Sequence, residues 1–102
     1  MAKHIVVNLF FKASTNLTVS QVQSTFTSLF PPAAKTAQFR VYDQGTHPEY
    51  YNQYPGAVSG DTIYEILVDV YPSASSALTA TVLKTTLTSA LPSGVFVATS
   101  QL

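Results

Sequence analysis

The chain of 102 residues contains no cysteine. It can therefore form no disulfide, no thiolate nucleophile and no zinc–thiolate centre. Charged side chains are also scarce, at 10% of the residues, and the five Lys and Arg balance the five Asp and Glu. Because a net charge of zero creates no field that gathers phosphates or anionic lipids, binding of nucleic acid or of a membrane surface is not expected.

Long hydrophobic runs and cofactor motifs are missing as well. No apolar stretch reaches the roughly 18 residues that a membrane span needs, and Met1-Ala2-Lys3 leads into a strand-like segment rather than a signal peptide. The chain has no glycine-rich phosphate loop, no GxSxG nucleophile elbow and no paired-carboxylate motif. These absences predict a cytoplasmic protein without a cofactor. The length fits a single domain over residues 1–102, and 46% hydrophobic residues are ample for its core.

The residues that are present alternate between two kinds of periodic segment. Four segments are typical of strands, because they alternate or are rich in β-branched and aromatic residues: 3–12, 37–43, 61–71 and 95–100. A first helix is expected from an N-cap at Thr18 or Ser20 to a stop at Pro31-Pro32. A second helix is expected to start near Pro72 and Ser73 and to bury one apolar face, made by Leu78, Val82, Leu83, Leu87 and Leu91.

The element order β-α-β-β-α-β is that of the split βαβ pattern. It predicts a ferredoxin-like α+β fold, with a four-stranded antiparallel sheet and both helices on one face. Because side chains alternate across a strand, each strand divides into two sets. The helix-facing set is wholly apolar and consists of Ile5, Val7, Leu9, Phe11, Phe39, Val41, Tyr64, Ile66, Val68 and Val70.

The opposite set forms an outer face whose composition is too apolar for a solvent-exposed surface and too polar for a core. It consists of His4, Val6, Asn8, Phe10, Gln38, Arg40, Tyr42, Ile63, Glu65, Leu67, Asp69 and Tyr71. Such a face would expose an apolar patch large enough to need a cover. We therefore expect a second subunit or a ligand there, and dimerisation through this sheet is the main structural prediction.

Polar residues on the outer face suggest a site. Strands one and three are antiparallel neighbours in the split βαβ order, so His4 is expected to approach Asp69, and Asn8 to approach Glu65. A carboxylate beside an imidazole holds the tautomer of the ring and suits it to proton transfer near neutral pH. The alternative, that His4 is an ordinary hydrogen-bonded side chain near the sheet edge, is the more frequent case. Arg40 can equally form a structural cross-strand pair with Glu65 or Asp69.

The loop over residues 43–60 is the other candidate site, since loops this long in compact domains are often lids or binding loops. Three of the six tyrosines cluster there with polar neighbours: Tyr50, Tyr51, Tyr54, His47, Glu49, Asn52 and Gln53. Their rings can bind a ligand or can fold back to cover a sheet edge. A metal site would need both histidines, His4 and His47, with a carboxylate such as Glu49, and no metal is predicted.

The opening Lys3-His4-Ile5-Val6, with Phe10-Phe11-Lys12, resembles the first strand of the stress-responsive A/B barrel (Dabb) family of the dimeric α+β barrel superfamily. The resemblance implies two ferredoxin-like subunits whose sheets pack into a barrel, and some relatives are cofactor-independent polyketide cyclases or monooxygenases. It implies that His4 takes the place of a family histidine lining the ligand cavity. The family commonly carries His-Pro-x-x-His after strand three, whereas this chain has Pro72-Ser73-Ala74-Ser75-Ser76, so a His-His arrangement is not expected.

Two functional hypotheses follow. In the first, a homodimeric α+β barrel binds an apolar or aromatic, polyketide-like molecule and acts as a cyclase or isomerase, with His4 and Asp69 moving protons. The candidate ligand-binding residues are Asn8, Arg40, Tyr42, Glu65, Tyr71, His47, Tyr50, Tyr51 and Tyr54. In the second, the chain is a non-enzymatic structural or interaction protein, such as a phage virion or tail-assembly subunit. Its low charge and abundant Ser and Thr are compatible with this role.

Overall fold

The computed structural model describes residues 4–102, and Lys3, with which the first predicted strand begins, lies outside them. The described residues form four strands and two α-helices: β1 (Ile5–Lys12), α1 (Val19–Leu29), β2 (Ala37–Thr46), β3 (Ile63–Pro72), α2 (Ala80–Ala90) and β4 (Phe96–Gln101). Short 3-10 helices lie in three of the connections: η1 (Ala13–Thr15), η2 (Pro32–Ala34) and η3 (Pro48–Asn52). No helix within residues 4–102 is both long and apolar enough to cross a membrane.

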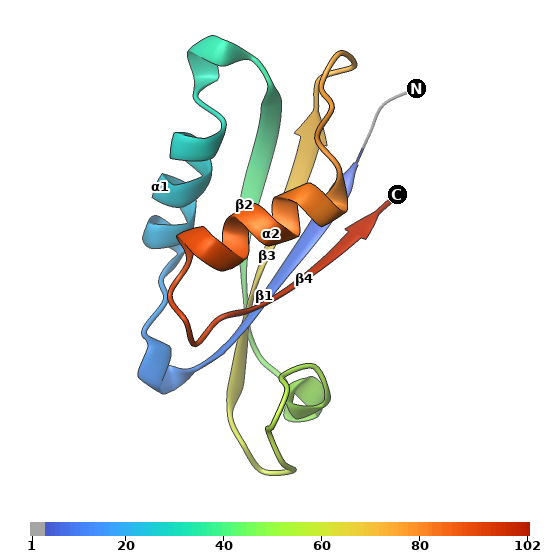
Figure 1. The fold of residues 1–102 in the computed structure, drawn as a ribbon. Helices are drawn as coiled ribbons and strands as arrows, with labels where there is room; N and C mark the ends of the chain where they lie inside the picture. The colour runs from blue at the N-terminus through green and yellow to red at the C-terminus, as the bar shows by residue number, and fades with distance from the viewer. Residues whose placement is uncertain (1–3) are drawn as a thin grey trace.

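The strands form one antiparallel sheet in the order β2-β3-β1-β4. The predicted α+β class, with a four-stranded antiparallel sheet and two helices, is confirmed. Both helices lie across the same face of this sheet (Figure 1). The pairing of β1 with β4 brings the two ends of the described chain together, since the backbone N–H of Leu102 donates to the carbonyl oxygen of His4 over 2.8 Å.

The core lies between the helices and the predicted helix-facing side chains of the sheet. Phe26 of α1 and Leu87 of α2 are fully buried against it. The ring of Phe26 packs on that of Phe39 in β2, with centroids 5.5 Å apart. All ten predicted helix-facing residues lie in this core or pack against it, which confirms the alternation. The core residues are Ile5, Val7, Leu9, Phe11, Leu17, Val22, Phe26, Phe30, Ile66, Val68, Val70, Leu83, Leu87, Leu91 and Val97.

Hydroxyl side chains begin both helices. The Thr18 hydroxyl accepts from the backbone N–H of Gln21, whose side chain accepts from the backbone N–H of Thr18, which completes a capping box. The predicted start of the second helix at Pro72 and Ser73 is wrong. Pro72 is the buried last residue of β3, and the next backbone N–H donates to Thr36 across the β2 pairing, so α2 begins after a cap at Thr79.

Val82 also departs from the prediction, because it is 53% exposed rather than part of the buried face of α2. Leu83 and Leu87 lie one helical turn apart and face the sheet. A residue adjacent to Leu83 is rotated by about 100° around the helix axis, which turns Val82 toward solvent.

β2 continues beyond the predicted strand end at Asp43. A β-bulge between Asp43 and Gly45 shifts the register with β3, and Gly45 takes a left-handed conformation with φ +67°. Glycine adopts this conformation without steric cost. The Asp43 carboxylate accepts from the Gly45 backbone N–H over 2.9 Å, so the bulge is stabilised locally. The strand therefore absorbs residues that the sequence analysis assigned to the long loop.

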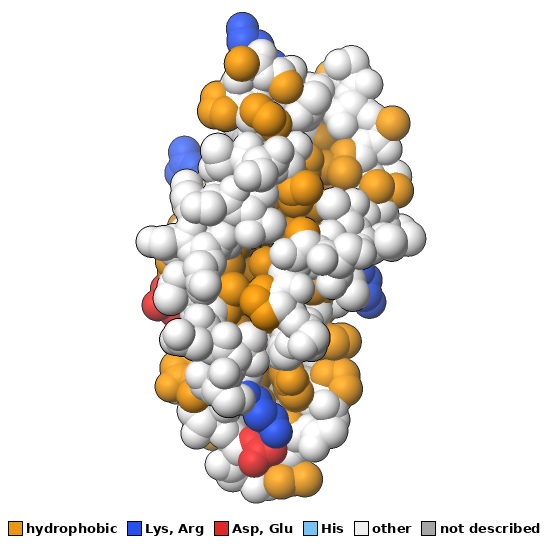
Figure 2. All heavy atoms as spheres, turned by 60° about the vertical axis from the view of Figure 1, so that its left-hand side comes forward, with side chains coloured by type: hydrophobic (Ala, Val, Ile, Leu, Met, Phe, Trp, Pro, Cys, Tyr) orange, Lys and Arg blue, Asp and Glu red, His pale blue; other side chains and the backbone are white. Residues whose placement is uncertain are grey.

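The surface carries few charges. On the face that Figure 2 presents, charged side chains are few and separated, apart from one cationic and one acidic side chain in contact near the bottom, and hydrophobic side chains are visible between the uncharged atoms. This distribution follows from the low charged fraction of the chain. This face therefore offers no extended patch of one charge sign.

Candidate functional site

The outer face of the sheet carries a histidine held between two side chains of β3. Ile5 pairs with Val70, so His4, one residue earlier, comes opposite Tyr71 and diagonal to Asp69. The His4 ring stacks on Tyr71, with centroids 4.6 Å apart and planes 11° from parallel. His4 Nε2 lies 2.9 Å from Asp69 Oδ1. The predicted approach of His4 to Asp69 is confirmed.

The geometry fixes which nitrogen of His4 is available for chemistry. An ionised carboxylate only accepts hydrogen bonds, so Nε2 donates to Asp69 and Nδ1 keeps its lone pair in the neutral ring. Within residues 4–102 no hydrogen bond reaches Nδ1. The side chains of His4 and Asp69 remain 29% and 21% exposed, so the pair is open to a small molecule. An imidazole oriented in this way can act as a general base.

A second polar pair lies further along the same face. Asn8 Nδ2 donates to Glu65 Oε2, as the sequence predicted. Glu65 is only 7% exposed, and the Tyr50 side chain is hydrogen-bonded to the same carboxylate. Burial, the hydrogen bond to Glu65 and the negative charges of Glu65 and Glu49 raise the pKa of Tyr50 to about 12. Tyr50 therefore stays a neutral donor at physiological pH.

An apolar strip separates the two polar pairs. His4 and Asn8 are four residues apart in an extended segment, which spaces them by about 13 Å at 3.3 Å per residue. Val6 and Leu67 lie between them and are half-buried, and Tyr42 of β2 is the register neighbour of Leu67. The outer face thus has hydrogen-bonding groups at two ends of an apolar floor.

The loop after β2 covers one end of the outer face. The ring of Tyr50 meets Phe10 edge-on, with centroids 5.6 Å apart, and Phe10 is only 5% exposed. Ile63 at the same end is fully buried. The sequence analysis counted both residues in the patch that a second subunit or a ligand would cover, but the chain itself buries them. The other end, with Tyr42 and Tyr71 about two-fifths exposed, has no such cover in the described chain.

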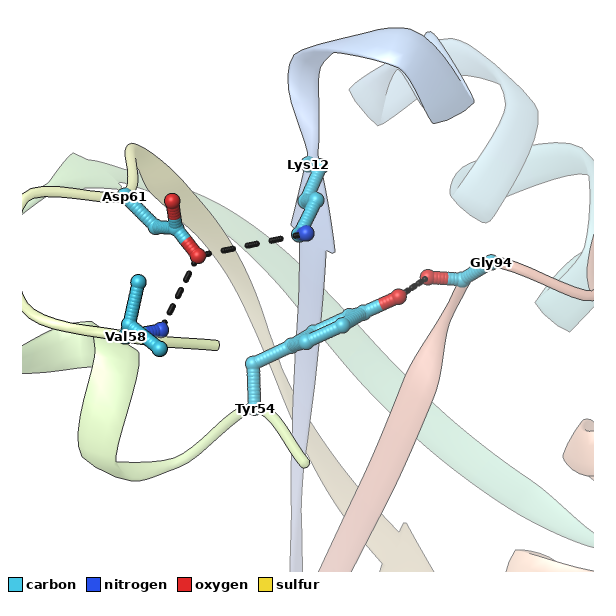
Figure 3. Close-up of polar contacts among 5 residues, drawn as sticks. All are labelled: Lys12, Tyr54, Val58, Asp61 and Gly94. Carbon is cyan, nitrogen blue, oxygen red and sulfur yellow. Dashed lines mark hydrogen bonds and ion pairs between the residues drawn. The ribbon is translucent and has the colours of Figure 1, made fainter. Parts of the chain in front are cut away.

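Contacts with the end of β1 and with the turn that precedes β4 hold the loop in place (Figure 3). The Tyr54 hydroxyl donates to the Gly94 carbonyl oxygen over 2.9 Å. Lys12 Nζ lies 5.8 Å above the Tyr54 ring and 3.9 Å from Asp61 Oδ2, and this carboxylate also accepts from the backbone N–H of Val58 over 3.0 Å. Tyr54, a predicted ligand-binding residue, therefore serves to anchor the loop.

The remaining candidates are not brought together. Arg40 is the register neighbour of Asp69, yet among the described residues it forms no ion pair, and Asp69 pairs with His4 instead. His47 lies 3.8 Å from Glu49 and packs beside Tyr50, at the end of the face away from His4. No group of three potential metal ligands occurs within residues 4–102.

Tyr51 is half-buried and makes no side-chain hydrogen bond or ring contact in the described part of the chain. Of the predicted loop tyrosines, Tyr50 alone reaches the polar residues of the outer face. What the sequence analysis missed is the stacking of Tyr71 on His4, although both residues were placed on the outer face. The alternation of side chains could have predicted this stacking, because residues that lie on the same face and directly opposite each other in paired strands are in contact.

A scan against protein-family models and a search of curated proteins both find no match to this chain. The functional argument therefore starts from the site itself.

Proposed function

We propose that the chain is a small-molecule-binding protein that acts as a cofactor-independent isomerase or cyclase, with His4 as its acid–base group. The observation that carries this proposal is the His4–Asp69 pair. The carboxylate orients one ring nitrogen, Tyr71 stacks on the ring, and Nδ1 stays free on the uncovered part of the outer face. The ligand would be apolar or aromatic, and polyketide-like by the resemblance in the first strand.

The arrangement suits proton transfer from a carbon next to a carbonyl group. His4 Nδ1 takes the proton, and the Asp69 carboxylate stabilises the imidazolium that forms. The substrate becomes an enolate. In an isomerisation, the imidazolium returns the proton to a different atom of the substrate. In a cyclisation, the enolate carbon attacks a second carbonyl of the same molecule, and the resulting alkoxide takes the proton. Both reactions balance without an oxidant or a metal.

We further propose that two copies pair through their outer faces, in a ferredoxin-like dimeric α+β barrel. The strand order β2-β3-β1-β4 with both helices on one face supports this arrangement. So does the uncovered apolar surface of Val6, Leu67, Tyr42 and Tyr71, which a partner sheet would shield from water. In such a dimer the His4–Asp69 pair would line an enclosed space between the sheets.

The test compares the two histidines of the chain. Aromatic β-diketones and linear polyketide mimics are incubated with the protein in D2O, and NMR measures deuterium incorporation next to the carbonyl groups. His4→Ala is expected to lower the exchange rate by about 10²- to 10⁴-fold, the usual contribution of a positioned base. His47→Ala is the matched control and should leave the rate unchanged. Equal rates for wild type and His4→Ala would refute the proposed role.

Sedimentation analysis provides the second measurement and also addresses the structural alternative. A dimer that Leu67→Glu dissociates supports pairing through the outer face. A ring or filament that uses the same face, without exchange activity, would instead support an assembly subunit. That alternative is favoured by one feature of the fold, the two edge strands β2 and β4, which pair on one side only within residues 4–102.

A further inference from the structure

A hollow lies on the helix side of the sheet, between the connection from β1 to α1 and the strands beneath it. η1 turns the chain from the end of β1 back to α1 (Figure 1). The hollow has a volume of about 400 Å³, which is within the range of sites for small organic ligands. The lining residues are Phe11, Ala13, Asn16, Leu17, Thr18, Asp43, Tyr64 and Ile66.

The four strand residues of this lining share one face of the sheet. Phe11 lies directly opposite Tyr64, and Asp43 lies directly opposite Ile66, so each pair points to one side. Phe11 and Ile66 belong to the core, and Tyr64 packs against it, which places all four side chains on the helix side. The sheet therefore separates this hollow from the outer face and from the site proposed there.

The floor of the hollow is apolar and partly aromatic. The rings of Phe11 and Tyr64 stack, with centroids 5.7 Å apart and planes 16° from parallel. Leu17 and Ile66 are buried, whereas Tyr64 is half-buried and keeps part of its surface available to a ligand. Such a floor favours the apolar body of a ligand, and the face of a tyrosine ring also attracts a cation.

Asp43 is the only charged residue of the lining. Its Oδ1 accepts from the Gly45 backbone N–H at the β-bulge. Its Oδ2 accepts no hydrogen bond within residues 4–102, and Asp43 forms no ion pair there. Glu49, Asp61 and Asp69, by contrast, each pair with a lysine or a histidine. A free carboxylate oxygen beside an aromatic ring is complementary to a cation that donates hydrogen bonds.

Asn16 adds an amide group to the lining. It follows η1 in a left-handed conformation, with φ +54°, which asparagine adopts more readily than most residues. Its side chain makes no hydrogen bond in the described part of the chain. The amide oxygen can therefore accept from a ligand that enters the hollow.

We propose that this hollow binds a small arylalkylammonium ion. The ammonium group contacts Asp43 Oδ2, and the aromatic body packs on Tyr64 and the apolar floor. The inference goes beyond the proposed function, because it uses neither the outer face nor His4 and does not require a dimer.

The experiment titrates three probes that share a phenyl ring and a two-carbon arm. 2-Phenylethylamine ends in an ammonium group, 2-phenylethanol in a hydroxyl and 3-phenylpropanoate in a carboxylate. Binding is followed by amide chemical shifts in ¹H–¹⁵N NMR spectra. The amine is expected to shift the amides of residues 11–18, 43–45 and 64–66. It should bind most tightly and the carboxylate most weakly, because the only charge in the lining is negative.

Asp43→Asn removes the charge but keeps an oxygen that can accept from the Gly45 N–H, so the bulge is preserved. It should weaken binding of the amine about two- to fivefold, the scale of an exposed ion pair, and leave binding of the alcohol unchanged. Asn16→Gly keeps the left-handed backbone and should weaken binding of the amine about twofold. Glu49→Gln is the matched control, because it removes an exposed carboxylate outside the hollow, and it should leave every affinity unchanged.

Equal affinities for the amine and the alcohol would overturn the inference, as would equal losses in Asp43→Asn and Glu49→Gln. Shifts confined to His4, Tyr42 and Tyr71 would also overturn it, because the probe would then bind the outer face. Conversely, His4→Ala should leave binding of the amine unchanged. Failure of this inference is therefore distinguishable from failure of the proposed function.

Discussion

The contact of Tyr50 with Glu65 makes the stability of the fold depend on pH in a defined direction. The pKa of Tyr50 is raised to about 12 in the folded chain, first by burial and then by its hydrogen bond to the Glu65 carboxylate. In the unfolded chain a tyrosine has a pKa of about 10. Below about pH 10 the phenol is protonated in both states, so the stabilisation is fully present. Between about pH 10 and 12 only the unfolded state loses the proton, so stability falls as pH rises.

The size of this effect follows from the shift. Two pKa units correspond to about 2.7 kcal/mol at 1.36 kcal/mol per unit. Tyr50 is half-buried rather than fully buried, and solvent screens its interactions, so we expect about 1–2 kcal/mol. At about pH 9, Tyr50→Phe should cost a similar amount, because the buried Glu65 carboxylate loses a donor.

Urea unfolding measures the free energies of unfolding of wild type and Tyr50→Phe from about pH 9 to 12. Other tyrosines and lysines also titrate there, so the informative quantity is the difference between the two proteins. That difference should shrink by about 1–2 kcal/mol as pH rises. Tyr51→Phe is the matched control, since it removes a phenol that has no hydrogen bond to a carboxylate. Parallel curves for wild type and Tyr50→Phe would refute the linkage.

Two further substitutions test the backbone and the helix start. Gly94→Ala places a Cβ against Thr15 Oγ1, closer than van der Waals contact allows, so it should lower the free energy of unfolding by about 1–3 kcal/mol. Adding Thr15→Ala should recover part of this loss, and a urea titration that finds Gly94→Ala as stable as wild type would contradict the close approach. Thr18→Ala removes the capping box of α1 and should cost about 1 kcal/mol, which Thr18→Ser should largely restore. Equal melting temperatures for all three proteins would contradict this role of Thr18.

Local periodicity accounts for what the sequence predicted well. The helix-facing residues of the sheet, such as Val7 and Val68, follow from alternation within a strand, which is a property of neighbouring residues. The approach of His4 to Asp69 follows from the same alternation, once β1 and β3 are taken as antiparallel neighbours. Periodicity erred at Val82, where an apolar residue beside the buried face was counted as part of it.

The amino-acid sequence by itself determined the order of the strands and helices and the division of the sheet into two faces. These depend on interactions within an element or between neighbouring strands. Only the tertiary structure decided that the loop covers Phe10, that Tyr54 contacts Gly94 forty residues away, and that the register of β1 and β3 brings His4 to Asp69. Such contacts join segments distant in the chain, and their geometry depends on how all the elements pack at once, which no local pattern encodes.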